Sequence, residues 1–158
     1  MPTKRMREFL DRYGIQYVTV QHSPAFTAAA VAASAHVPVT EMAKTVMIDV
    51  DGQMAMAVLP ASCQIDFELL RDTLGANHVE LLHEREFADR FPDCAAGAMP
   101  PFGNLYGMPV YVAETLGDDE YIAFSAGSHR EVVIMAYADY ERLVSPTVVR
   151  FAVETLAL

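Results

Sequence analysis

The chain has little positive charge. Among its 158 residues, 11 are Lys or Arg and 21 are Asp or Glu, which gives a formal net charge of −10. Its two lysines are Lys4 and Lys44, and no basic run occurs. Sequence-independent binding to nucleic-acid backbones depends on clustered Lys and Arg, so a protein that coats DNA or RNA is disfavoured. A protein that contacts a nucleic-acid terminus through one small positive spot remains compatible with this charge.

Cysteine and long apolar runs are also scarce. The two cysteines, Cys63 and Cys94, are too few for a disulfide framework, and we expect a reducing, cytoplasmic setting. No apolar run reaches the roughly 18 residues that a membrane span needs, so no membrane association is expected. The first residues lead into an amphipathic segment rather than an apolar core, so a secretory signal is not expected either.

Apolar residues are plentiful without forming such runs. They make up 53% of the chain and charged residues 20%, which is typical of a globular protein rather than a disordered one. The length suits one domain with a substantial core. We therefore expect a single domain over residues 1–158.

Helix and strand signals alternate along the chain, and strand signals then predominate. Thr3 is placed to cap a first helix that Gly14 ends, and Asp51-Gly52 between two apolar runs predicts a β-hairpin. Further helices are predicted at 27–35, 66–74, 84–91 and 138–143, and strands at 15–20, 42–50, 53–59, 78–82, 109–113, 120–125, 131–136 and 147–152. This order predicts an α+β fold with a mixed, strongly curved β-sheet, a partial barrel, flanked by short helices.

Lys44 is the most informative single residue. It lies inside a predicted strand with apolar neighbours, where a lysine must extend its charge to solvent, form a pair or line a cavity. One interpretation is a solvated lysine on an edge strand, since lysines are mostly exposed. The other is a compact cation presented to an anionic or polarised oxygen.

Two glycine-containing loops are further candidates. The segment 97–104, Gly-Ala-Met-Pro-Pro-Phe-Gly-Asn, is a stiff loop whose backbone N–H groups can approach a ligand, or else a structural crossover with a buried Phe. Gly127-Ser128-His129 directly follows a predicted strand, where binding sites tend to lie, although many such histidines are merely partly buried.

Other chemistries find no support in the motifs. The chain has no Gly-x-Ser-x-Gly elbow, no P-loop and no Gly-x-Gly-x-x-Gly, although composition alone leaves a Ser-His-Asp triad open. His78 and His83 are five residues apart, which does not place both on one helix face, and the two cysteines lack zinc-ligand spacing. We expect neither a metal nor a cofactor.

Taken together, these segments resemble the YbaK family, also called the prolyl-tRNA synthetase-associated (INS-like) editing domain. The resemblance covers roughly residues 22–144. The segment 22–27, His-Ser-Pro-Ala-Phe-Thr, leads into a small-residue helix, and residues 43–46, Ala-Lys-Thr-Val, carry a lysine like the family's essential one. Residues 97–101 match its Gly-x-x-x-Pro loop, and residues 127–129 match its Gly-Ser/Thr-His element.

The resemblance implies a YbaK-like fold with a groove at these loops. It also implies a trans-editing deacylase, a hydrolase that cleaves the ester between a small amino acid and the terminal adenosine of a mischarged tRNA. It does not identify the amino acid. The non-catalytic alternative is a YbaK-like module that binds a tRNA end, an amino acid or a synthetase partner.

The resemblance also assigns roles to residues. It makes Lys44 the catalytic residue and places the substrate against the two loops. Separately, because a second, smaller pocket can hydrolyse what a synthetase pocket admits, we expect a wall of Pro101 and Phe102 to set the size limit. The substrate-binding residues are then Gly97, Ala98, Met99, Pro101, Phe102, Gly103, Gly127, Ser128 and His129, and further pocket residues are His22, Thr27 and Thr45. The expected partners are the acceptor end of an aminoacyl-tRNA and an aminoacyl-tRNA synthetase, with no DNA and no membrane.

Overall fold

The computed structural model describes residues 3–155. Its α-helices are α1 (Lys4–Arg12), α2 (Ala28–Ala35), α3 (Phe67–Leu74), α4 (Glu84–Phe87) and α5 (Tyr137–Val144). Its strands are β1 (Tyr17–Gln21), β2 (Ala43–Val50), β3 (Gln53–Pro60), β4 (Cys63–Ile65), β5 (Val79–Leu81), β6 (Val110–Ala113), β7 (Tyr121–Ser125), β8 (Glu131–Ala136), β9 (Thr147–Val149) and β10 (Ala152–Glu154). Short 3-10 turns lie at Ala88–Arg90, Gly103–Leu105 and Glu114–Asp118. The mixed α+β class is confirmed.

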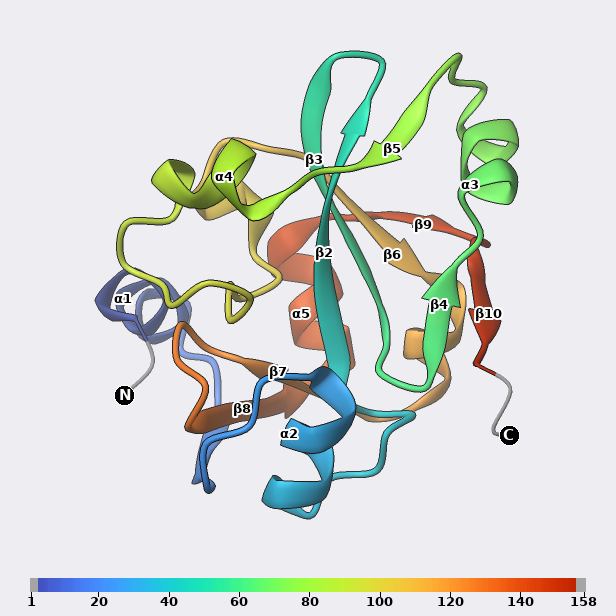
Figure 1. Ribbon diagram of the computed structural model, residues 1–158. Helices are drawn as coiled ribbons and strands as arrows, with labels where there is room; N and C mark the ends of the chain where they lie inside the picture. Colours follow the sequence, from blue (N-terminus) through green and yellow to red (C-terminus); the bar gives the residue numbers. More distant parts are fainter. Residues whose placement is uncertain (1–2, 156–158) are drawn as a thin grey trace.

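The strands of the described residues form three sheets (Figure 1). The largest has the order β5-β2-β3-β6-β9, in which β6 runs parallel to both neighbours and the other pairs are antiparallel. A second sheet has the order β1-β8-β7, and β10 pairs with β4 in a third. The expectation of one strongly curved sheet is thus only loosely met. The first two sheets meet at a single parallel bridge between Met42 and Ala123, rather than through a continuous ladder.

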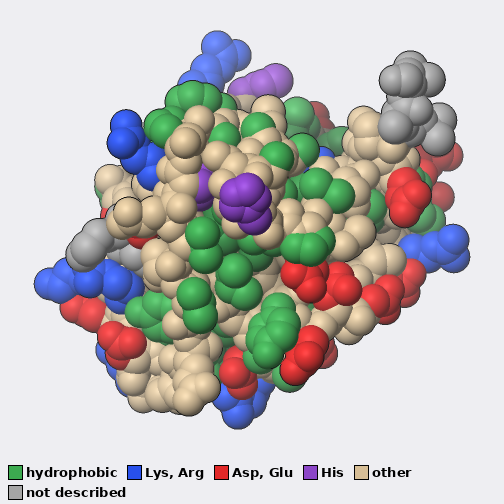
Figure 2. All heavy atoms as spheres, turned by 90° about the horizontal axis from the view of Figure 1, so that it is seen from below, with side chains coloured by type: hydrophobic (Ala, Val, Ile, Leu, Met, Phe, Trp, Pro, Cys, Tyr) green, Lys and Arg blue, Asp and Glu red, His purple; other side chains and the backbone are tan. Residues whose placement is uncertain are grey.

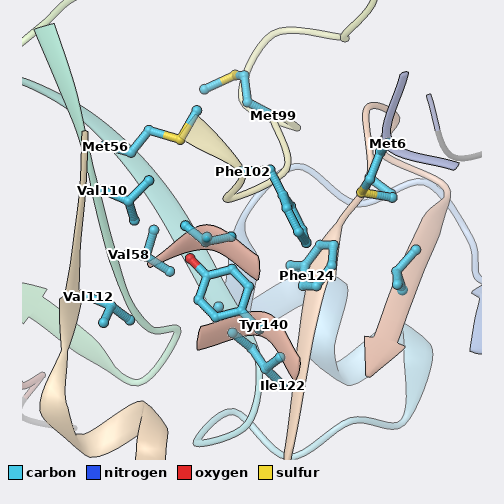
Figure 3. Close-up of a cluster of buried hydrophobic side chains, with 14 of the residues drawn as sticks. Met6, Met56, Val58, Met99, Phe102, Val110, Val112, Ile122, Phe124 and Tyr140 are labelled. Atoms are coloured by element: carbon cyan, nitrogen blue, oxygen red, sulfur yellow. The ribbon is translucent and has the colours of Figure 1, made fainter. Parts of the chain in front are cut away.

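The main core lies between the two larger sheets. Strands β3 and β6 contribute Met56, Val58, Val110 and Val112, β7 contributes Ile122 and Phe124, and α1 and α5 contribute Met6 and Tyr140 (Figure 3). Because successive strand residues point to opposite faces, Ala123 between two core residues instead packs toward α2, in a second cluster with Val31. Strand β7 therefore separates the main core from the space beneath α2.

Most local predictions are confirmed by their capping geometry. The Oγ1 of Thr3 accepts a hydrogen bond from the Met6 N–H at 3.2 Å, and Asp66 caps α3 in the same way. Asp51 and Gly52 both have positive φ, 50° and 90°, as a tight two-residue hairpin turn requires. The β2–β3 register runs without interruption from Ala43↔Pro60 to Val50↔Gln53.

Two local predictions differ from the structure, and one strand was not predicted. The helix at 84–91 is one α-turn followed by a 3-10 turn, because Pro92 disfavours helical geometry just before it. The strand at 147–152 is two strands in different sheets, β9 and β10, separated where Phe151 turns into the core with no exposed surface. Strand β4 was not predicted, since its three residues are too short for a periodicity signal.

No helix among residues 3–155 is long and apolar enough to cross a bilayer.

Phe102 is at the centre of the main core. Its side chain has 0% exposure, and its ring packs edge-on against Phe124 and Tyr140, with centroids 5.4 and 5.5 Å away. The Tyr140 hydroxyl donates a hydrogen bond to the Pro101 carbonyl at 2.8 Å, which holds the loop before Phe102 against α5. The loop 97–104 is therefore anchored in the core by its second half.

We predict that Phe102→Ala lowers the free energy of unfolding by about 3–5 kcal/mol, because it removes a large buried ring and leaves a cavity. The matched control is Phe26→Ala, since Phe26 is 76% exposed and its removal leaves no buried cavity. Urea denaturation of both variants measures the difference. A loss for Phe102→Ala no larger than for Phe26→Ala would contradict the placement of this ring in the core.

Candidate functional site

A cavity of about 130 Å³ opens where α2, the start of β2, the end of β7 and the loop 97–99 meet. Figure 1 shows this region in the lower centre, where β2 descends to α2. Six residues expected at the site line it together: Thr27, Lys44, Thr45, Gly97, Met99 and His129. The cavity is small and mostly apolar, and the lysine lies at its wall. Four separate chain segments therefore converge on one pocket.

Lys44 is half-buried on β2, opposite Leu59 of β3. Burial lowers the pKa of its ammonium from the usual value, and the nearby Cys63 thiol acts in the opposite sense more weakly. Within residues 3–155, no carboxylate forms an ion pair with Lys44. The cation is thus partly stripped of water without a compensating protein charge, and an anionic or polarised ligand oxygen would stabilise it.

The two glycine-containing loops are tied to one another. The Gly127 N–H donates to the Ala98 carbonyl at 2.7 Å, and the Ala95 N–H donates to the Gly127 carbonyl at 2.8 Å. Gly97 and Gly127 have φ of 79° and 102°, a region that favours glycine. A Cβ on Gly127 would also run into the Thr3 methyl group. This packing holds the start of the 97–104 loop beside the cavity.

An aromatic pair lies at the cavity. The Phe26 and His129 rings are 4.9 Å apart, and Phe26 is 76% exposed, which is unusual for so large an apolar side chain. His129 Nε2 lies 2.6 Å from the Ala96 carbonyl oxygen, so this nitrogen carries the proton and donates it. Figure 2 shows the underside of the molecule, where histidine and hydrophobic side chains gather near the middle and acidic ones lie mainly to the right.

The hydroxyl groups around the cavity differ in availability. Thr27 uses its Oγ1 to cap α2, accepting from the Ala30 N–H at 3.1 Å, and Ser128 Oγ accepts from the Arg130 N–H at 3.3 Å. Thr45 and Ser125 line the cavity, and within the described part of the chain their hydroxyls have no hydrogen-bond partner. Two hydroxyls are therefore available to a ligand.

The remaining expected residues do not line this cavity. Ala98, Pro101, Phe102 and Gly103 are buried outside the lining, and the Phe102 ring lies in the main core, so the expected wall of Pro101 and Phe102 is not part of this cavity. Gly127 and Ser128 support the lining from the adjacent loop. His22 is also outside the lining; its Nδ1 contacts the Ser23 carbonyl at 2.7 Å, while its buried Nε2 has no partner among the described residues.

Sequence reasoning missed about half of the lining. The missed residues are Phe26, Ala28, Val31, Met42, Ala43, Val46 and Ser125. Most are small or apolar and carry no chemical signature. Phe26 lies within the segment 22–27 that carried part of the family resemblance, and this could have identified it.

Among residues 3–155, no three His, Cys, Asp or Glu side chains gather in a way that could hold a metal ion.

Comparison with known proteins gives a consistent result. The family model described as "Aminoacyl-tRNA editing domain" matches residues 22–143. The chain is 29% identical over 154 residues to the "Multifunctional Ser/Thr-tRNA deacylase ProXp-y" of Escherichia coli (strain K12), with 94% of this chain and 91% of that protein covered.

Two solved structures share the fold. The hypothetical protein APE2540 superposes with a TM-score of 0.84 at 16% identity, over 95% of this chain and 100% of that chain. A protein described as a candidate trans-editing enzyme for prolyl tRNA synthetase superposes with a TM-score of 0.78 at 18% identity, over 94% of each chain. At these identities the likeness concerns the fold.

We predict that Gly127→Ala destabilises the protein beyond the strain of its positive φ. The matched control is Gly107→Ala, with φ of 71° and open space around its would-be Cβ; it should cost about 1–2 kcal/mol. Gly127→Ala should cost about 1–3 kcal/mol more, because the methyl group meets Thr3.

A double-mutant cycle identifies the cause. Thr3→Ser keeps the capping hydroxyl of α1 and removes the obstructing methyl group. We measure the change that Thr3→Ser makes in the free energy of unfolding, by chemical denaturation, in the wild type and in the Gly127→Ala variant. This change should be more favourable in the Gly127→Ala variant. Additive effects would show that contact with Thr3 is not the reason for glycine at this position.

Proposed function

Since the chain belongs to the aminoacyl-tRNA editing domain family, whose model covers most of its length, we propose that its cavity receives the aminoacyl end of a tRNA mischarged with serine or threonine. The protein is a hydrolase of the aminoacyl-tRNA ester bond that removes a small amino acid from a mischarged tRNA. The proposal concerns the identity of that amino acid and the roles of the residues around the cavity.

One observation carries the residue assignment: Lys44 lines the cavity, half-buried and without an ion pair in the described chain. In the addition step of ester hydrolysis, negative charge develops on the carbonyl oxygen. A preorganised cation in a sheltered site stabilises this developing charge more than it stabilises the neutral carbonyl of the ground state. This difference lowers the barrier to hydrolysis. We assign Lys44 to this oxygen or to the neighbouring oxygens of the terminal nucleotide.

The reaction itself makes modest demands. A water oxygen adds to the carbonyl carbon, the bond from that carbon to the ribose oxygen breaks, and the proton that the water gives up passes to the ribose oxygen. The lining contains no hydroxyl hydrogen-bonded to an imidazole, and His129 already donates from Nε2 to Ala96. A water, assisted by the free hydroxyl of the terminal ribose, therefore suffices as nucleophile, and positioning supplies most of the rate enhancement.

The lining favours serine and threonine. A cavity of about 130 Å³ admits a small side chain, and its apolar wall from Ala28, Val31 and Met42 would not pair with a charged one. The free hydroxyls of Thr45 and Ser125 provide partners for a substrate hydroxyl. A site that hydrogen-bonds a substrate hydroxyl can reject analogues that lack it. The E. coli relative, named a Ser/Thr-tRNA deacylase, supports the same choice.

The charge of the chain bears on how the substrate arrives. With a net charge of −10, the protein has weak electrostatic attraction for RNA. We propose that it contacts chiefly the acceptor end, and that an aminoacyl-tRNA synthetase partner brings the mischarged tRNA to it. The separate fold match to a candidate prolyl tRNA synthetase trans-editing enzyme is compatible with this arrangement.

We predict that Lys44→Ala abolishes deacylation while the protein stays folded. Losing a charge-assisted contact to the developing oxyanion should cost about 3 kcal/mol, at least ~100-fold in rate. Lys44→Arg should also fail, because a planar guanidinium fork cannot replace a compact ammonium in a small cavity. The measurement is the single-turnover rate on Ser-tRNA and Thr-tRNA, with circular dichroism and thermal melting as fold controls.

The matched control is Lys4→Ala. Lys4 is the other lysine of the chain, and its side chain is 82% exposed on α1 in a pair with Glu8. It should retain wild-type activity. A folded Lys44→Ala variant that deacylates at near the wild-type rate would overturn the assignment of Lys44 and favour a role for His129.

A second prediction concerns the size limit. Ala28→Leu adds bulk to the α2 wall of the cavity at a partly exposed helical position, where leucine is well tolerated. Deacylation of Thr-tRNA should fall before that of Ser-tRNA, since threonine carries one more methyl group. Single-turnover rates on both substrates test this. An equal fall for both would mean that α2 positions the ester without selecting the side chain.

A further inference from the structure

Strand β2 has one edge that other strands cover only at its two ends. At the beginning, the Ala123 N–H of β7 donates to the Glu41 carbonyl at 3.0 Å, beside the Met42 bridge. At the far end, β5 pairs with β2 from Ile48 to Val50, and the Leu82 N–H donates to the Met47 carbonyl at 3.0 Å. Figure 1 shows β5 beside only the upper half of β2, after which the chain turns away toward α4.

The uncovered stretch, residues 44–46, coincides with the cavity. Lys44, Thr45 and Val46 all line it, and the end of β7 at Ser125 lies on its other side. Within residues 3–155, none of these three residues pairs with a strand on this edge. The gap in the ladder therefore forms part of the cavity wall.

The β2–β3 register decides which backbone groups face the gap. The Ala61 N–H donates to the Met42 carbonyl at 2.7 Å, so Met42 directs its backbone toward β3. In an antiparallel pair, hydrogen-bonded positions alternate, so residues 44, 46, 48 and 50 also face β3. Thr45 and Met47 face the other way, and the bond from Leu82 to the Met47 carbonyl confirms this alternation.

Thr45 is thus the residue whose N–H and C=O point into the gap. Among residues 3–155, neither group forms a hydrogen bond with another strand or loop on this edge, and neither is directed at β3. Edge-strand donors and acceptors that are sheltered from bulk water favour a ligand with the complementary pair of groups. The natural complement of one strand residue is the N–H and C=O of one other residue.

An aminoacyl group is such a residue. Its α-ammonium is a donor, its ester carbonyl is an acceptor, and one Cα separates the two. We propose that the aminoacyl end of the substrate pairs with Thr45 as a single antiparallel strand residue, the ammonium donating to the Thr45 carbonyl and the ester carbonyl accepting from the Thr45 N–H. This inference rests on the proposed deacylase function and adds to it the way in which the amino acid is held.

Two consequences follow from the pairing. Residues opposite one another in a ladder have their side chains on the same face, with Cβ atoms about 4.5–5.5 Å apart. The substrate side chain therefore lies beside the Thr45 side chain, whose free hydroxyl is suited to a serine or threonine partner. The ester carbonyl also receives a fixed backbone donor next to Lys44, where negative charge develops during hydrolysis.

The donor is tested by Thr45→Pro, which removes the N–H. Proline is tolerated on an edge strand where the N–H makes no ladder bond, so the fold should persist. The matched control is Thr45→Val, which keeps the N–H and the branched shape and loses the hydroxyl. Thr45→Pro should lower the single-turnover rate on Ser-tRNA by about 100-fold or more relative to Thr45→Val, the loss expected for one oxyanion donor.

A backbone ester at position 45, introduced by semisynthesis, removes the same donor and retains the threonine side chain. It serves as the decisive variant if Thr45→Pro does not fold, and it should show the same loss of rate. Near-wild-type deacylation by the ester variant, or by a folded Thr45→Pro variant at the rate of Thr45→Val, would overturn the pairing.

The role of the Thr45 carbonyl as an acceptor is tested by changing the substrate instead of the protein. A tRNA esterified with 3-hydroxypropanoate matches Ser-tRNA except that it lacks the α-ammonium. The wild type should hydrolyse it at least about tenfold more slowly than Ser-tRNA, once both rates are corrected for uncatalysed hydrolysis. This loss is expected because one charged hydrogen bond is missing. Equal acceleration of both esters would overturn the role of the Thr45 carbonyl. If the wild type hydrolyses neither Ser-tRNA nor Thr-tRNA, the proposed function itself is wrong, which is a distinct outcome.

Discussion

The pairing of β2 with β3 is the constraint on which the site depends. Eight consecutive residues of each strand are in register around the Asp51-Gly52 turn, and a slip of one residue would move every side chain of β2 to the opposite face. The same slip would exchange the backbone groups that face β3 with those that face the cavity. The hairpin therefore determines both where Lys44 projects and which residue offers its N–H and C=O to the gap.

The rest of the molecule builds a small compartment against that edge. Strand β7 and α2 close one side through small and branched residues, and the anchored loop 97–104 closes another. The loop is rigid because Phe102 and the Pro101 carbonyl are held in the core by Phe124 and Tyr140. Core packing at one end of this loop thus positions the backbone at the other end, next to Lys44.

The net negative charge of the chain and the partial burial of Lys44 both affect how an RNA substrate is recognised. An overall charge of −10 offers an RNA substrate little general attraction, so recognition concentrates on the few groups that reach the acceptor end. Burial lowers the pKa of Lys44, because its charged form loses contact with water. An anionic or polarised oxygen of the substrate would therefore stabilise the charged form strongly. The exposed Phe26 beside His129 adds an aromatic surface at the same place. Selectivity thus arises from local complementarity rather than from long-range charge.

The sequence by itself determined the local elements and the chemical candidates. Turn and capping residues such as Asp51, Gly52 and Thr3 act over a few residues, so the hairpin and most helices were predictable, and Lys44 was notable as one of two lysines inside an apolar strand. Only the tertiary structure decided that Phe102 supports the core instead of the cavity, that β9 and β10 join different sheets, and that Ser125 and Val31 meet beside Lys44. The tertiary structure also left the backbone groups of Thr45 without a pairing strand, in the gap between β7 and β5. Such outcomes depend on which distant segments pack together, and an apolar side chain carries the same pattern whether it faces a core or lines a pocket.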